Sequence, residues 1–140
     1  VPGRAHRAGV ARLADGATDM ASSRRARGYA MESISIVVSS LDSNEMGDDV
    51  RESVADVCLG AVLIAMQDPS LFVRRNACIA LEPIMELFDD DGNALRERLD
   101  DVLQALHGLG SDAVIEAVTA AAVIAENIGS DFVSSTAYRG

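Results

Sequence analysis

The sequence predicts an all-α fold, an α-α superhelix of about three helix pairs. Apolar residues recur three and four positions apart, and no stretch alternates in the way that strands do. The composition is 49% hydrophobic but only 4% aromatic, so aliphatic and small side chains that suit close helix packing supply most of the apolar volume. A stretch of sequence also recurs at intervals near the period of about 40 to 47 residues that is typical of helix-pair solenoids.

The N-terminal segment is basic, and the helix that it predicts is weak. Residues 1–28 hold six arginines against two aspartates, a balance of +4. Apolar periodicity predicts a helix over about Gly3–Leu13, although Gly9 and Gly16 disfavour it. We interpret residues 1–22 as a basic N-terminal helix or flexible head before the repeats, with an organelle transit peptide as the alternative.

Three longer helices follow, each ended by polar or turn-forming residues. They are predicted over about Ser23–Leu41, Asp48–Met66 and Pro69–Phe88. Asp68 is expected to cap the last of them, and Pro83 is expected to bend it. The side chains expected to be buried include, in chain order, Ala26, Ile34, Val38, Val54, Ala61, Ile64, Val73, Ala77 and Leu81.

Two more helices are predicted, over Asn93–His107 and Ala113–Ile128, and the second is apolar on nearly all sides. A helix of that kind needs cover on more than one side, so we expect a further repeat or a partner chain over it. The tail, residues 130–140, is a poor cap, and the chain begins at Val1 rather than Met, so we expect a segment of a longer protein. The repeat domain is assigned to residues 23–129, with second helices near 23–41, 69–88 and 113–128.

An acidic body follows the basic head, because the net charge is −10 overall and therefore −14 beyond residue 28. Such a body repels phosphate, which argues against nucleic-acid binding through the main domain. No apolar run approaches the length of about eighteen residues that a membrane span needs. Cys58 and Cys78 lie in apolar runs without CxxC spacing, so we interpret them as buried, reduced thiols of an intracellular, cytoplasmic protein.

The most specific motif is the stretch Asp68–Leu81, in which Asp-Pro is followed by Val-Arg and then by small residues. Ala26–Ile34 aligns with Val73–Leu81 at an offset of 47, and Val114–Ala122 aligns at an offset of 41 but lacks the arginine. This motif resembles the second helix of HEAT repeats, which are armadillo-like α-solenoids, and the resemblance covers about residues 24–128. It implies that the second helices line a concave surface, that Asp68 caps its turn, and that Arg74 pairs with a neighbouring repeat's turn, so both are structural candidates.

No catalytic, metal-binding or cofactor-binding residue is nominated, and no cofactor is expected. The histidines are His6 and His107, and the second ends a predicted helix, where the helix dipole favours a cation. The paired His-Glu motifs of metal-binding HEAT enzymes have no counterpart in the sequence. Asp89–Asn93 lacks the ligand spacing and the closing glutamate of a calcium loop.

A binding surface is the better-supported functional hypothesis. Residues that lie off the buried stripes of the second helices mix apolar, polar and acidic side chains, as a peptide-binding surface does. They are Tyr29, Glu32, Arg75, Asn76, Ile79, Glu82, Glu86, Ile115, Glu116 and Thr119. The predicted function is a scaffold that binds a partner protein or peptide on its concave face without catalysis.

Two alternatives stay open. Ala122–Phe132 resembles nuclear transport receptors of the importin-β type, which would imply shuttling between nucleus and cytoplasm. A HEAT-like lyase or enzyme subunit that acts on a bound chromophore or a modified protein belongs to a different class, and it would need a ligand-sized cleft with a polar catalytic group.

Overall fold

The computed structural model describes residues 2–41, 45–87, 99–108 and 122. Its helices are α1 (Pro2–Thr18), α2 (Arg24–Ser40), α3 (Asp48–Ala65), α4 (Leu71–Met85) and α6 (Leu99–Gly108). No strand occurs within these ranges, so the all-α prediction is confirmed for them. Among the residues described, no helix combines the length and the apolar character needed to cross a membrane.

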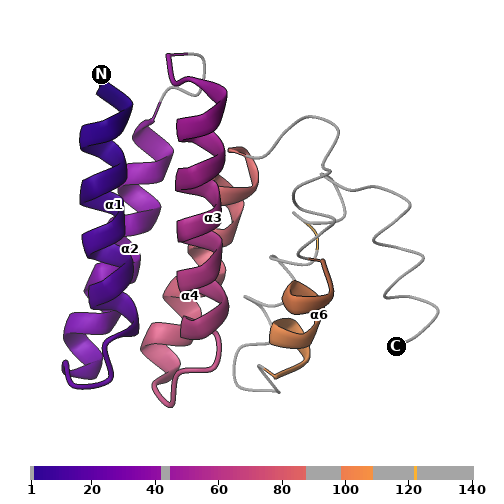
Figure 1. Ribbon diagram of the computed structural model, residues 1–140. Helices are drawn as coiled ribbons and strands as arrows, with labels where there is room; N and C mark the ends of the chain where they lie inside the picture. Colours follow the sequence, from indigo (N-terminus) through magenta and orange to yellow (C-terminus); the bar gives the residue numbers. More distant parts are fainter. Residues whose placement is uncertain (1, 42–44, 88–98, 109–121, 123–140) are drawn as a thin grey trace.

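The first four helices form two layers (Figure 1). α1 and α3 lie side by side in one layer, and α2 and α4 lie side by side in the other. The chain reverses at each turn, so α2 and α4 run in the same direction, and each packs against the helix that precedes it. α6 contacts α3, on the side away from α1.

The two helix pairs follow the same plan, displaced by 47 residues. α1 ends at Thr18 and α3 at Ala65, while the N-caps of α2 and α4 are Ser23 and Ser70. The offset of 47 that aligns Ala26–Ile34 with Val73–Leu81 is therefore also the offset between helix boundaries. The sequence recurrence corresponds to a recurrence of helix and turn.

α1 is longer than predicted and belongs to the core. It spans Pro2–Thr18 rather than Gly3–Leu13, and its side chains Val10, Ala14 and Ala17 are buried. α1 packs against both α2 and α3. This packing stabilises the helix enough to offset the three glycines within it, Gly3, Gly9 and Gly16, since tertiary contacts outweigh helix propensity.

Most of the predicted buried positions of α2, α3 and α4 are correct. Ile34, Val38, Val54, Ala61, Val73, Ala77 and Leu81 are all buried. The prediction that Ala26 and Ile64 are buried was wrong, because both are exposed. At the start of α2 the neighbouring Arg27 takes the buried position instead, and Ile64 borders a hollow between α3 and α6.

Some predictions concern residues outside the described ranges. α6 covers the second half of the helix predicted at Asn93–His107. The helix predicted at Ala113–Ile128, the cover expected over it and the tail at 130–140 lie outside the described residues, apart from Ala122.

Candidate protein-binding face and the ion pair beneath it

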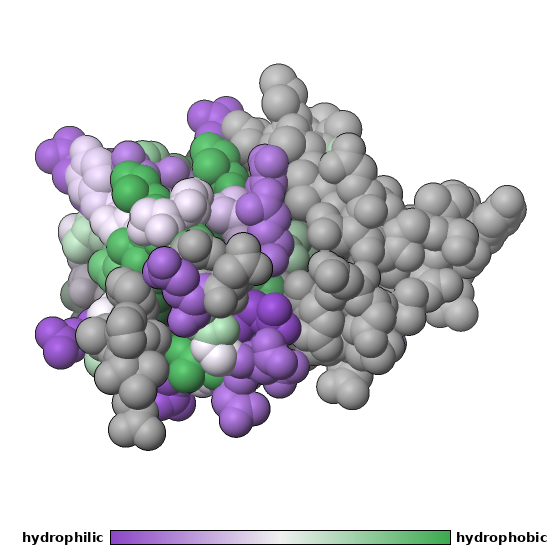
Figure 2. Space-filling model, turned by 90° about the horizontal axis from the view of Figure 1, so that it is seen from above, coloured by the Kyte–Doolittle hydropathy of each residue, from purple (hydrophilic) through white to green (hydrophobic). Residues whose placement is uncertain are grey.

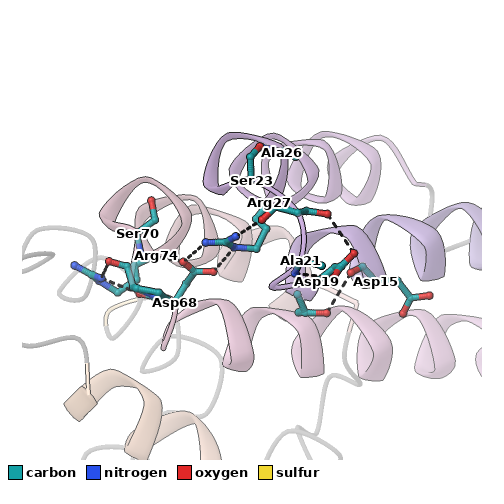
Figure 3. Close-up of polar contacts among 12 residues, drawn as sticks. Asp15, Asp19, Ala21, Ser23, Ala26, Arg27, Asp68, Ser70 and Arg74 are labelled. Carbon is teal, nitrogen blue, oxygen red and sulfur yellow. Dashed lines mark hydrogen bonds and ion pairs between the residues drawn. The ribbon is translucent and has the colours of Figure 1, made fainter.

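A buried ion pair joins the two helix pairs. Arg27 of α2 donates from Nε to Asp68 Oδ2 at 2.7 Å and from Nη2 to Asp68 Oδ1 at 3.0 Å. Its remaining nitrogen, Nη1, donates to the carbonyl oxygen of Ser22 at 2.6 Å. Arg27 and Asp68 are 5% and 6% exposed, and they are the buried charged residues of the described part of the chain. Figure 3 shows the guanidinium lying between its own turn and the turn of the next pair.

Asp68 organises the turn before α4 but does not cap that helix. The N-cap is Ser70, whose side chain makes no capping hydrogen bond, and α4 begins at Leu71. Asp68 instead accepts a hydrogen bond from the Ser70 amide at 2.9 Å. The predicted N-cap at Asp68 is therefore wrong, because the N-cap lies two residues later at Ser70. The Asp68 carboxylate instead stabilises the turn before the helix and accepts its other hydrogen bonds from Arg27.

Arg74 binds the turn from the other side. Its Nη1 donates to the carbonyl oxygens of Asp68 at 2.8 Å and Pro69 at 3.0 Å. Arg27 occupies the equivalent position 47 residues earlier and makes the equivalent bond to Ser22. Arg27 thus reaches the turn of the neighbouring pair. The turn after α6, at residues 109–112, lies outside the described residues, so the pairing of Arg74 with a neighbouring turn stays a prediction.

The ion pair shifts the pKa values of both partners toward the charged state. The hydrogen bond with Asp68 raises the pKa of Arg27 above its usual value, against the lowering effect of burial. Burial raises the pKa of Asp68, but the hydrogen bonds from Arg27 and the Ser70 amide, with the charges of Arg27 and Arg74, outweigh it. The net pKa of Asp68 is lowered, so both groups stay charged at neutral pH.

The outer face of α2 and α4 carries four exposed apolar side chains, which we call the apolar array. Tyr29 and Ile36 of α2 are 54% and 63% exposed, and Phe72 and Ile79 of α4 are 41% and 57% exposed. The rings of Tyr29 and Phe72 meet edge to face, with centroids 5.5 Å apart. On each helix the second residue lies seven positions after the first, which is two turns or about 10 Å along the axis.

The position of the Phe72 ring against α2 depends on Gly28. A Cβ added at Gly28 would overlap the ring of Phe72. The absence of a side chain therefore lets the ring lie against the backbone of α2, where it meets Tyr29. Figure 2, which looks along the helices, shows hydrophobic residues reaching the surface among hydrophilic ones.

The residues predicted for binding lie partly on this face. Those that the structure describes are Tyr29, Glu32, Arg75, Ile79, Glu82 and Glu86, all exposed, and Asn76, which is half-buried. Asn76 is committed locally, because its Nδ2 donates to the carbonyl oxygen of Phe72 at 3.0 Å. Ile115, Glu116 and Thr119 lie outside the described residues.

Sequence reasoning missed Ile36 and Phe72. The alignment at an offset of 47 pairs Tyr29 with Asn76, so it does not reveal that Tyr29 contacts Phe72. The signal that could have found the array is the repeated spacing of seven, from Tyr29 to Ile36 and from Phe72 to Ile79, at positions off the buried stripe.

A groove lies at the N-terminal end of this face. It encloses about 520 Å³ between the starts of α2 and α4, and its lining residues are Arg24, Arg25, Tyr29, Pro69, Ser70, Leu71 and Phe72. The two arginines are a further feature that the sequence reasoning did not select. The groove is open and combines aromatic, aliphatic and cationic groups.

The described residues bear on metal ligation and on thiol chemistry. Within the described ranges, no group of three or more His, Cys, Asp or Glu side chains is gathered in a way that could hold a metal ion. Burial raises the pKa of Cys58 to about 12, so that thiol is not a nucleophile at neutral pH. His107 is exposed in the last turn of α6.

No model of a known protein family matches the chain, and neither a curated protein nor a solved structure matches it.

Proposed function

We propose that the chain is a segment of a HEAT-type α-solenoid that works as an interaction scaffold, with no catalytic activity of its own. It holds a partner protein or peptide on the face formed by α2 and α4. The observation that carries the proposal is the apolar array, in which four large apolar side chains remain exposed on two adjacent helices.

Two features support a solenoid. The ends of α1 and α3 and the N-caps of α2 and α4 recur at 47 residues, and equivalent helices of successive pairs lie side by side in the same layer. The bond from Arg27 to Asp68 links one pair to the turn of the next, as the HEAT resemblance implies for an arginine and aspartate of neighbouring repeats. In such an assembly each pair covers its apolar face with its neighbour, and the second helices form one continuous surface.

The apolar array supports binding on that surface. Single exposed apolar residues are common, whereas several large apolar side chains gathered on two adjacent helices are typical of an interaction site. Tyr29 and Phe72 both carry rigid aromatic rings, and Tyr29 is also amphipathic. Such side chains are typical of the residues that contribute most to interface affinity. The buried free thiols of Cys58 and Cys78 are consistent with an intracellular, cytoplasmic location.

The experiment is a selection of random peptides displayed on phage against the immobilised chain, followed by fluorescence anisotropy with the peptides selected. We expect Ile79→Ser to weaken binding about tenfold or more, since a central apolar contact is worth about 1–2 kcal/mol. The matched control is Ile64→Ser, because Ile64 is 58% exposed but lies on α3 in the other layer. Circular dichroism checks that both variants are folded.

Failure to select any peptide that binds the folded chain would refute the proposal. So would an equal loss of affinity in the Ile79 and Ile64 variants, because it would mean that the peptides do not use the face of α2 and α4.

A further inference from the structure

We infer that the groove between the N-terminal ends of α2 and α4 takes the acidic end of the partner peptide, while apolar side chains of the same peptide pack on the apolar array. This inference rests on the proposed function and adds the chemistry and orientation of the ligand. The observation that leads to it is the charge of the groove, which is opposite to that of the protein as a whole.

Arg24 and Arg25 are placed where their charges are unfavourable to the protein itself. They are the first two residues of α2, and the positive end of a helix dipole disfavours cations there. The first turns of α2 and α4 contain no acidic residue. Both arginines are exposed, and neither makes a hydrogen bond or ion pair with the described part of the chain. A ligand with carboxylates would relieve this repulsion.

The groove combines this charge with a contact surface. Arg24 and Arg25 share its lining with Tyr29 and Phe72, and no acidic side chain lines it. A peptide carboxylate in the groove would therefore lie beside the aromatic end of the apolar array. From there, an apolar side chain two helical turns further along a partner helix would reach the level of Ile36 and Ile79.

The opposite end of the face has the opposite charge, which sets the orientation. Glu82 and Glu86 are exposed near the C-terminal end of α4, and Glu32 is exposed in the middle of α2. The two helices run in parallel, so the face is basic at one end and acidic toward the other. Such a gradient selects a peptide that carries its acidic residues over the groove, since complementary charge fixes register as well as partner.

The same gradient favours an acidic peptide over a nucleic acid. A single strand could stack bases on Tyr29 and Phe72 and place a phosphate by the arginines. Its next phosphates would then approach Glu32, Glu82 and Glu86, on a protein whose net charge is −10. A peptide can be acidic at one end alone.

The test uses three fluorescein-labelled synthetic peptides with the full chain. The peptides share a pair of leucines two helical turns apart and differ at one end, which carries glutamates, lysines or serines, and each is made in both orientations. We expect the glutamate peptide to bind most tightly, by about tenfold over the lysine peptide, and its affinity to fall as salt rises. The overall charge of the protein alone would give the opposite preference.

The variant Arg24→Glu/Arg25→Glu should reverse this preference. The matched control is Arg12→Glu, which changes an exposed arginine on α1 in the other layer and should leave the preference intact. Acidic residues at the start of α2 suit the helix dipole, so the double variant should melt no lower than the wild type. A loss of binding in that variant is then not a loss of folding.

The outcomes separate this inference from the proposed function. If the three peptides bind equally and Ile79→Ser weakens all of them, the charge preference is refuted and the binding face stands. If none of the peptides binds, or if an oligothymidine probe binds more tightly than the glutamate peptide, the acidic ligand is refuted. If the phage selection also yields no binder, the proposed function falls as well.

Discussion

Removal of the Asp68 carboxylate should destabilise the protein far more than the loss of a helix cap. Asp68→Ala deletes two hydrogen bonds from the Arg27 guanidinium, of 2.7 and 3.0 Å, and one from the Ser70 amide. Breaking a buried ion pair costs about 3–5 kcal/mol, because the remaining charge is left buried without its partner. The pair lies in the turn before α4 rather than in the middle of the core, so we expect the lower end, about 3 kcal/mol.

Urea unfolding followed by circular dichroism measures this difference. With a slope of about 2 kcal/mol per molar urea, a loss of about 3 kcal/mol lowers the midpoint by about 1.5 M. The control is Asp19→Ala, because Asp19 likewise accepts a hydrogen bond from an amide two residues on, that of Ala21, but is exposed. We expect about 1 kcal/mol for the control, as for a cap. Equal effects of the two substitutions would refute the importance of the buried pair.

Four other predictions follow from the buried groups. Folding lowers the pKa of Asp68, so its contribution to stability is complete above the unfolded pKa near 3.9 and is lost as pH falls below that value. The urea midpoint of Asp68→Asn should therefore depend less on pH in this acid range than the midpoint of the wild type. Ala77 is fully buried, so Ala77→Leu should cost about 1–3 kcal/mol by overpacking and Ala77→Gly only about 1 kcal/mol, and equal tolerance in thermal melts would contradict this packing. Gly28→Ala should lower the melting temperature rather than raise it, as an alanine in a helix normally would, because the added methyl group displaces the Phe72 ring. Cys58 should resist iodoacetamide at pH 8 in the native protein, since with a pKa of about 12 only about one thiol in ten thousand is ionised. Rapid labelling of Cys58, detected on its peptide by mass spectrometry, would disprove its burial.

The helices could be predicted because their signals are local. The spacing of apolar residues and the turn residues place α2, α3 and α4 within about three residues of their observed ends. α1 was predicted too short, because the burial of Ala14 and Ala17 against other helices offsets the glycines and leaves no local signal. Long-range packing decided that boundary.

The faces of the helices were harder to predict, because exposure depends on which neighbour covers each side. An apolar stripe places Ala26 inside and does not select Arg27, whereas the pairing of Arg27 with a carboxylate 41 residues away buries the arginine. Tyr29 and Ile79 were assigned correctly to the outer face, but their neighbours Ile36 and Phe72 were not. The packing of α4 against α2 brings Phe72 next to Tyr29. An alignment of repeats compares equivalent positions and does not contain such a contact between helices.

The buried ion pair also has a mechanical meaning for recognition. A slide of α4 along α2 by one turn, about 5.4 Å, would pull Asp68 away from both nitrogens of Arg27. The same slide would move Phe72 past Tyr29 and change the spacing of the side chains offered to a partner. The ion pair therefore fixes the offset between α2 and α4 at which Tyr29 and Phe72 meet on the outer face.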